Sequence, residues 1–173
     1  MTIIRVVALF LVVLLAPGLA PAQAPSPAAA PIKQAIVGAW HLVSVASEAA
    51  DGARGEPFGR APKGIIIFTE GGQFSLFQST AEIPRLAAND RTRATADEAM
   101  AVVRNSIAYY GTYTVDDAKR ELAFVIDDST FANVMGGPPQ RRVVTSLTAT
   151  ELALHNPRTP SGLTLRTLWR KAP

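Results

Sequence analysis

Cysteine is absent from this 173-residue chain, and charged side chains make up only 18% of it. The missing cysteine excludes disulfide bonds, thiolate metal sites, a cysteine nucleophile and a lipid attached to an N-terminal cysteine. A chain without disulfides depends on an apolar core, and a chain of this length buries enough surface to form one. We therefore expect one domain that folds on its core alone.

Histidine is almost as scarce, since only His41 and His155 are present. They form no H-x-H or H-x-x-x-H spacing, so we expect no metal site, and nothing else in the sequence indicates a cofactor. Motifs for a serine nucleophile or a phosphate-binding loop are also missing, and no catalytic residue is predicted. The near-neutral charge includes no basic stripe with interleaved aromatics, which argues against nucleic acid as a partner.

Long apolar runs are missing except for Val6–Ala16. This run is about half of the ~20 residues that a membrane-spanning helix needs. It follows Arg5 and precedes small residues, an order typical of a secretory signal peptide; the alternative is a buried N-terminal helix. Pro21 and Pro25 disfavour neighbouring cleavage sites, so we expect cleavage after Ala22.

The predicted organisation then has three parts: a signal peptide over residues 1–22, an Ala/Pro-rich linker over 23–35 and one domain over 36–171. The mature chain would begin at Gln23 and reside in the periplasm or outside the cell. It would have no stable membrane anchor after cleavage. The sequence indicates no oligomeric state.

From Ile36 onward, short runs of alternating apolar and polar residues are separated by turn signals. One such signal is Glu70-Gly71-Gly72, where glycine suits the positive φ of a tight turn. The sequential hairpins favour an all-β, antiparallel up-and-down barrel of about eight strands, because closure removes exposed sheet edges. The predicted strands are 40–45, 64–69, 73–79, 109–115, 121–126, 140–147, 151–155 and 163–169.

One α-helix is inserted in this pattern, over Thr95–Ala108. Thr95 and Glu98 have the spacing of a capping box, in which each side chain bonds the other residue's backbone N–H. Met100, Val103 and Ile107 recur at intervals of three and four, which predicts one buried stripe.

Several segments carry a family resemblance: Ile36–Ser44, Gly71–Ser75, Ala108–Asp116 and Leu168–Arg170. In this order they resemble the bacterial lipocalin-like domain family over residues 36–170. The resemblance implies a small barrel with an internal pocket and no particular reaction. Gly38-x-Trp40 is also similar to the wider lipocalin signature, in which a tryptophan closes the barrel floor. The resemblance implies that a basic residue, Arg166 or Arg170, packs over that tryptophan.

Aromatic residues supply most of the candidate site. Trp40 and Trp169 lie on the first and last strands, which meet when a barrel closes, so we expect both to be buried. Tyr109 and Tyr113 share a strand face, where ligand contact and simple packing are equal alternatives. An eight-stranded barrel is either filled or holds one small ligand. The candidate ligand-binding residues are Trp40, Phe74, Leu76, Tyr109, Tyr113 and Phe124.

Two neighbouring arginines, Arg141 and Arg142, point to opposite faces of a predicted strand. One of them can enter the barrel, where an unpaired guanidinium is costly and would mark an anionic ligand group. We favour a solvated edge strand instead.

The favoured function is an exported, non-enzymatic protein that binds a small apolar molecule in the barrel cavity. One alternative is a barrel enzyme (an isomerase, cyclase or lyase) that acts on an apolar substrate. The other is an interaction protein whose interior is filled by its own side chains. Converging ionisable groups in the cavity favour the enzyme, an apolar cavity favours the carrier, and a packed interior favours the third.

Overall fold

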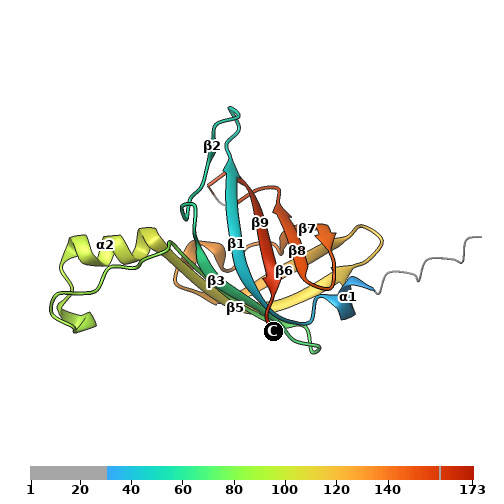
Figure 1. Ribbon diagram of the computed structural model, residues 1–173, viewed down its shortest axis with the longest axis horizontal. Coiled ribbons are helices and arrows are strands. Elements are labelled where there is room, and N and C mark those ends of the chain that lie inside the picture. The colour runs from blue at the N-terminus through green and yellow to red at the C-terminus, as the bar shows by residue number, and fades with distance from the viewer. Residues whose placement is uncertain (1–30, 160) are drawn as a thin grey trace, which may run out of the picture.

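A computed structural model describes residues 31–159 and 161–173. The predicted signal peptide, its cleavage site and most of the predicted linker lie outside these residues. The described elements, shown in Figure 1, are α1 (Ile32–Ala35), β1 (Gly38–Glu48), β2 (Arg54–Gly55), β3 (Lys63–Phe68), β4 (Gln73–Ser79), η1 (Arg91–Arg93), α2 (Ala96–Asn105), β5 (Ser106–Asp116), β6 (Glu121–Ser129), η2 (Ala132–Val134), β7 (Gln140–Leu147), β8 (Glu151–Asn156) and β9 (Thr164–Lys171).

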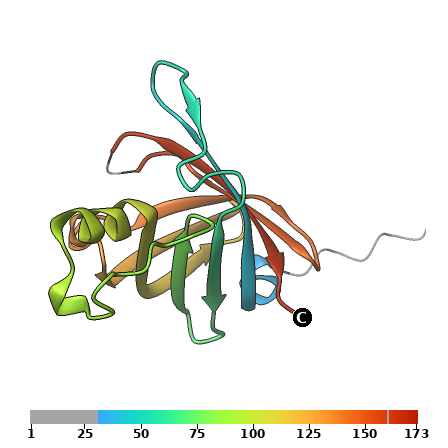
Figure 2. The same ribbon diagram turned by 60° about the vertical axis from the view of Figure 1, so that its left-hand side comes forward.

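Eight of these strands form a closed antiparallel barrel (Figures 1 and 2). Each strand from β3 to β8 pairs with the next one along the chain. β1 pairs with both β3 and β9, which closes the barrel. The remaining strand, β2, has two residues and pairs with the end of β1. The predicted up-and-down barrel of eight strands with an inserted helix is therefore confirmed.

The two ends of the barrel differ in their connections. Turns of three or four residues join β3 to β4, β5 to β6 and β7 to β8 at the end that α1 covers, which we call the closed end. Long connections join the strands at the opposite, open end: residues 49–62, 80–105, 130–139 and 157–163.

The predicted linker is shorter than expected at its C-terminal side, because α1 belongs to the packed domain. Ile32 and Ile36 lie one helical turn apart and are 4% and 0% exposed. The Ile32 backbone N–H donates to the Asp117 carboxylate at 2.6 Å, which ties α1 to the turn between β5 and β6. The spacing of two isoleucines by four residues places both on one helix face.

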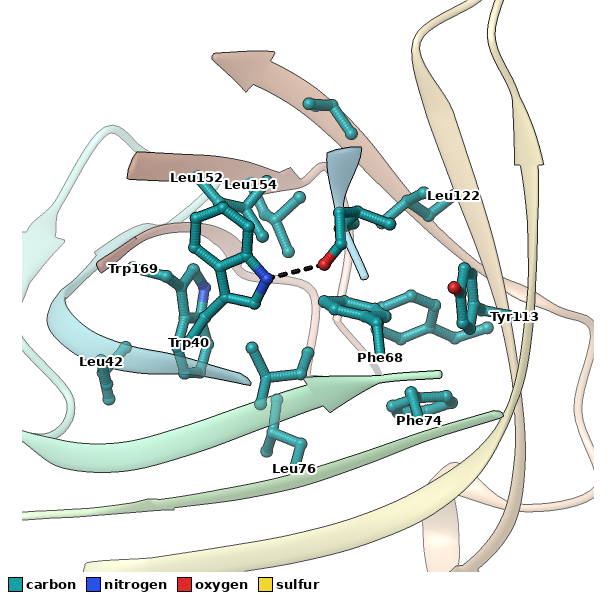
Figure 3. Close-up of a cluster of buried hydrophobic side chains, with 14 of the residues drawn as sticks. Trp40, Leu42, Phe68, Phe74, Leu76, Tyr113, Leu122, Leu152, Leu154 and Trp169 are labelled. Atoms are coloured by element: carbon teal, nitrogen blue, oxygen red, sulfur yellow. Dashed lines mark hydrogen bonds between the residues drawn. The ribbon is translucent and has the colours of Figure 1, made fainter. Parts of the chain in front are cut away.

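The core fills the closed end (Figure 3). Trp40 and Trp169 are 0% and 1% exposed, so their predicted burial is confirmed. Trp40 Nε1 donates to the Ile36 carbonyl oxygen at 2.7 Å. Phe68 meets Tyr113 edge to face, with 5.0 Å between ring centroids, and this geometry is favourable for aromatic pairs.

The basic residue over Trp40 is Lys171, not Arg166 or Arg170 as predicted. Lys171 Nζ lies 4.3 Å from the Trp40 ring centroid and donates to the Val37 carbonyl oxygen. Burial lowers the pKa of this ammonium group. Side chains alternate along β9, so Trp169 and Lys171 share a face while Arg170 lies exposed opposite them.

A bulge in β1 changes which side chains face inward. The register shifts between Leu42 and Ser44, so Trp40, Leu42 and Val45 are all buried. Strict alternation would place His41 and Val45 on one face, but His41 is exposed while Val45 is buried. The extra residue of a bulge reverses the alternation beyond it.

The inserted helix α2 stands away from the barrel (Figure 1). Its predicted capping box is present, with Thr95 and Glu98 each bonding the other's backbone N–H. The predicted buried stripe is wrong, because Met100 and Val103 are 47% and 68% exposed. The helix ends at Asn105 rather than at residue 108, since residues 106–108 pair with β4 as the start of β5.

Candidate functional site

The open end of the barrel contains a cavity of about 180 Å³. Its lining comes from strand ends and from the long connections beside them. Most of the lining side chains are apolar or aromatic: Phe58, Ile107, Tyr109, Ile126, Phe131, Val134 and Leu165. The segment that follows β6 contributes Phe131 and Val134, and η2 thereby forms part of the wall.

A narrower space of about 40 Å³ adjoins this cavity on the core side. Its inner wall consists of core residues, including Leu76, Phe124 and Trp169. The two spaces share Gln78, Tyr109, Arg142, Asn156 and Leu165 as lining residues. These five side chains therefore lie where the packed core gives way to the cavity.

The six predicted ligand-binding residues all face the interior, but at different depths. Tyr109 lines both spaces, and Leu76 and Phe124 line the inner one. Phe74 packs against two of these, stacked on Phe124 with 4.2 Å between centroids and edge-on to Tyr109 at 5.9 Å.

Trp40 and Tyr113 belong to the packed core instead of the cavity lining. The Tyr113 hydroxyl donates to the Thr69 carbonyl oxygen at 2.7 Å, beside the turn between β3 and β4. Burial raises the pKa of this hydroxyl. The structure thus brings Tyr109 to the cavity, and Leu76 and Phe124 to the narrower space beside it. Trp40, Phe74 and Tyr113 lie in the packed core.

The two adjacent arginines of β7 have different environments. Arg141 faces outward and forms an ion pair with Glu121, which holds the pKa of that carboxyl below its usual range. Arg142 points inward and is 7% exposed. The preferred interpretation of a solvated edge strand is wrong for Arg142, because the closed barrel gives β7 a partner on each side.

The guanidinium of Arg142 is held by uncharged groups. Its Nη1 donates to the Arg141 carbonyl oxygen at 3.0 Å, and its Nη2 donates to Gln140 Oε1 at 2.9 Å. Its Cζ lies 5.3 Å from the centroid of the Phe124 ring, within the range of a cation–π contact. These contacts orient the guanidinium without neutralising its charge.

Two buried amides accompany Arg142, and neither was predicted as a site residue. Gln78 and Asn156 are each 7% exposed. Asn156 Oδ1 accepts from the Arg158 backbone N–H at 3.3 Å. Within the described residues, the Gln78 amide and the Asn156 Nδ2 have no protein hydrogen-bond partner, and both side chains line the cavity.

A sequence signal for these polar residues does exist. On β4 the inward series runs Phe74, Leu76, Gln78, and on β8 it runs Leu152, Leu154, Asn156. Each series is apolar at the closed end and polar at its last inward position, near the open end. A polar residue at the last inward position of a strand therefore indicates where the packed core ends and the cavity begins.

The chemistry available in the cavity is limited to apolar contact, hydrogen bonding and one fixed positive charge. None of the described residues that line the two spaces is Asp, Glu or His. Within residues 31–159 and 161–173, no group of three or more His, Cys, Asp or Glu side chains is placed to hold a metal ion. No helix in this part of the chain is long and apolar enough to span a membrane.

The lipocalin-like domain family matches residues 37–172. The chain belongs to this family. The lipocalin-like domain is also similar to a crystal structure of a lipocalin-like protein from Bacteroides uniformis, with 16% identity, 79% of this chain and 97% of that chain covered, and a TM-score of 0.41.

Two further solved structures resemble the lipocalin-like domain. A designed fluorescence-activating β-barrel shares 9% identity, covers 82% of this chain and 98% of its own, and has a TM-score of 0.42. Bovine odorant binding protein, in complex with a selenium-containing odorant, shares 15% identity and has a TM-score of 0.41. The match covers 87% of this chain and 78% of that chain. No curated protein matches the chain.

Proposed function

We propose that the lipocalin-like domain is an exported carrier that binds one small, largely apolar molecule at the open end of its barrel. The observation that supports this most directly is the cavity of about 180 Å³ with its apolar wall and few converging polar groups. Ligand sites generally have this composition. A cavity of this volume accommodates a small ligand.

The lining favours a carrier over the two alternatives considered from the sequence. The open end is unfilled, in contrast to the closed end, which argues against an interior fully occupied by its own side chains. Proton-transfer chemistry needs an acid or base within hydrogen-bonding reach of the substrate. Tyr109 and Arg142 are the ionisable residues of the lining, and no carboxylate or imidazole accompanies them there.

Replacing Tyr109 by alanine tests the location of the ligand. We expect calorimetric titration with 1-octanol to show saturable binding at one site of the wild-type protein. Tyr109→Ala should weaken this binding about tenfold, because losing ~60 Å² of apolar contact at ~25 cal/mol per Å² corresponds to about 1.5 kcal/mol.

Tyr110→Ala is the matched control, since Tyr110 is the next residue of β5, faces outward and is 52% exposed. The Tyr110→Ala variant should bind 1-octanol with the same affinity as the wild-type protein. Thermal unfolding of both variants shows that the barrel is intact. Equal losses in the two variants, or no saturable binding by the wild type, would contradict the proposed site.

Export is supported by the order of a positive residue, a short apolar run and small residues at the start of the chain. We expect N-terminal sequencing of the protein recovered from the periplasm or the medium to begin at Gln23. Recovery of the protein in the membrane fraction with residues 1–22 still attached would contradict this expectation.

A further inference from the structure

We infer that the ligand carries a carboxylate or a similar planar anion, which Arg142 binds at the inner side of the cavity. This inference rests on the function proposed above and adds the chemical class of the ligand. It gives the bound molecule an orientation, with its charged group at Arg142 and its apolar body toward the open end.

The charge of Arg142 is uncompensated in the described structure. A guanidinium has five N–H donors and does not lose its proton in proteins. Among the described residues, two of these donors have partners, and both partners are uncharged. The ion pairs found there engage Glu48, Asp116 and Glu121, and none includes Arg142. A cation that is more than nine-tenths buried without a counterion is costly to the fold.

Two more hydrogen-bond donors lie beside Arg142. Gln78 and Asn156 are as deeply buried as Arg142 and line the same two spaces. Each offers an amide N–H₂ group that has no protein acceptor in the described residues. A single anion placed there would accept hydrogen bonds from three side chains on β4, β7 and β8. An uncharged apolar ligand would leave these donors unused.

The shape of the site also suits a planar anion. Hydrogen bonds to Gln140 Oε1 and the Arg141 carbonyl oxygen hold the guanidinium over the Phe124 ring. A fixed guanidinium fork matches the two oxygens of a carboxylate and binds them in parallel. The larger space lies on the outer side of this fork, where Ile107, Phe131 and Val134 form an apolar wall for the remainder of the molecule.

The test compares two probes of equal chain length, octanoate and 1-octanol, by calorimetry at neutral pH. Wild-type protein should bind octanoate at least about tenfold more tightly than 1-octanol, in keeping with a charge-assisted hydrogen-bonded pair. Arg142→Gln should remove this preference, so that octanoate binds no more tightly than 1-octanol. Arg141→Gln removes the same charge from the outer face, where Arg141 pairs with Glu121, and should retain the preference.

The outcomes separate the inference from the proposed function. Equal affinity of the wild type for both probes, or a preference that persists in Arg142→Gln, overturns the anion site and leaves an apolar carrier. Failure of both probes to bind overturns both proposals.

Arg142→Lys is a second variant for the case in which Arg142→Gln does not fold. Lysine keeps the positive charge but lacks the planar pair of N–H donors that binds a carboxylate. In Arg142→Lys, a several-fold fall in the preference for octanoate supports the assignment. An unchanged preference rejects it.

Discussion

Replacing Trp40 by alanine is expected to lower the free energy of unfolding by about 3–5 kcal/mol, as truncation of a buried tryptophan typically does. Trp40 is fully buried, and it links α1 to the core through its hydrogen bond to the Ile36 carbonyl oxygen. It also lies under the Lys171 ammonium group, at the junction of β1 and β9. One truncation therefore removes core volume, releases α1 and uncovers a cation.

Urea denaturation monitored by circular dichroism measures this loss. Tyr110→Ala again provides the control, since it removes a large aromatic side chain from the outer surface and should change the stability by no more than about 0.5 kcal/mol. A Trp40→Ala protein with the wild-type denaturation midpoint would refute the role assigned to this residue in closing the barrel.

Gly111→Ala is expected to lower the free energy of unfolding by a similar amount, because it adds an atom where the main chain leaves no room. A Cβ atom at this position would lie 1.9 Å from the Val125 carbonyl oxygen and 3.0 Å from the Asp127 backbone nitrogen. Both atoms belong to the main chain of β6, at the bulge where the register between β5 and β6 shifts, so no side-chain rotation relieves the contact. Overpacking of this kind costs about 3 kcal/mol where the backbone cannot yield.

Gly137→Ala is the matched substitution for this prediction. Gly137 lies in the connection between β6 and β7, with no atom within 4 Å of an added Cβ. Its variant should keep the wild-type stability to within about 0.5 kcal/mol. If thermal unfolding ranks Gly111→Ala and Gly137→Ala alike, the close approach of β5 and β6 at Gly111 is not essential to the fold.

The barrel could be predicted because its determinants are local. Alternating residues specify each strand, and the turn at residues 70–72 specifies a hairpin, so the order of the barrel strands follows from the sequence. The predicted helix began correctly for the same reason, since the capping box at Thr95 and Glu98 involves only neighbouring residues.

The errors arose where distant parts of the chain compete with local pattern. The apolar spacing of Met100 and Val103 is typical of a buried stripe, yet the connection that carries α2 leaves the barrel, and no core lies beneath it. Ile107 continues the same spacing but belongs to β5, because pairing with β4 overrides helix propensity. The bulge in β1 is likewise a property of its pairing with β9.

The candidate site was predicted only in part, because depth in a barrel is not a local property. Tyr109, Leu76 and Phe124 were identified from their shared strand faces, and they line the two spaces. Alternation also placed Tyr113 on an inward face but did not show that it lies in the packed layer. For Arg142 the sequence favours a solvated edge strand, because burying an arginine without a known partner is unfavourable.

The junction of β1 and β9 also has a consequence for biogenesis. Lys171 and Val37, whose contact joins the two strands, lie 134 residues apart in the sequence. Contacts between such distant residues form late and slow the folding reaction. Until β9 docks, β1 and β8 each present a row of free main-chain hydrogen-bonding groups to other chains. β9, which follows all the other barrel strands along the chain, is therefore the strand that protects the folding barrel from aggregation.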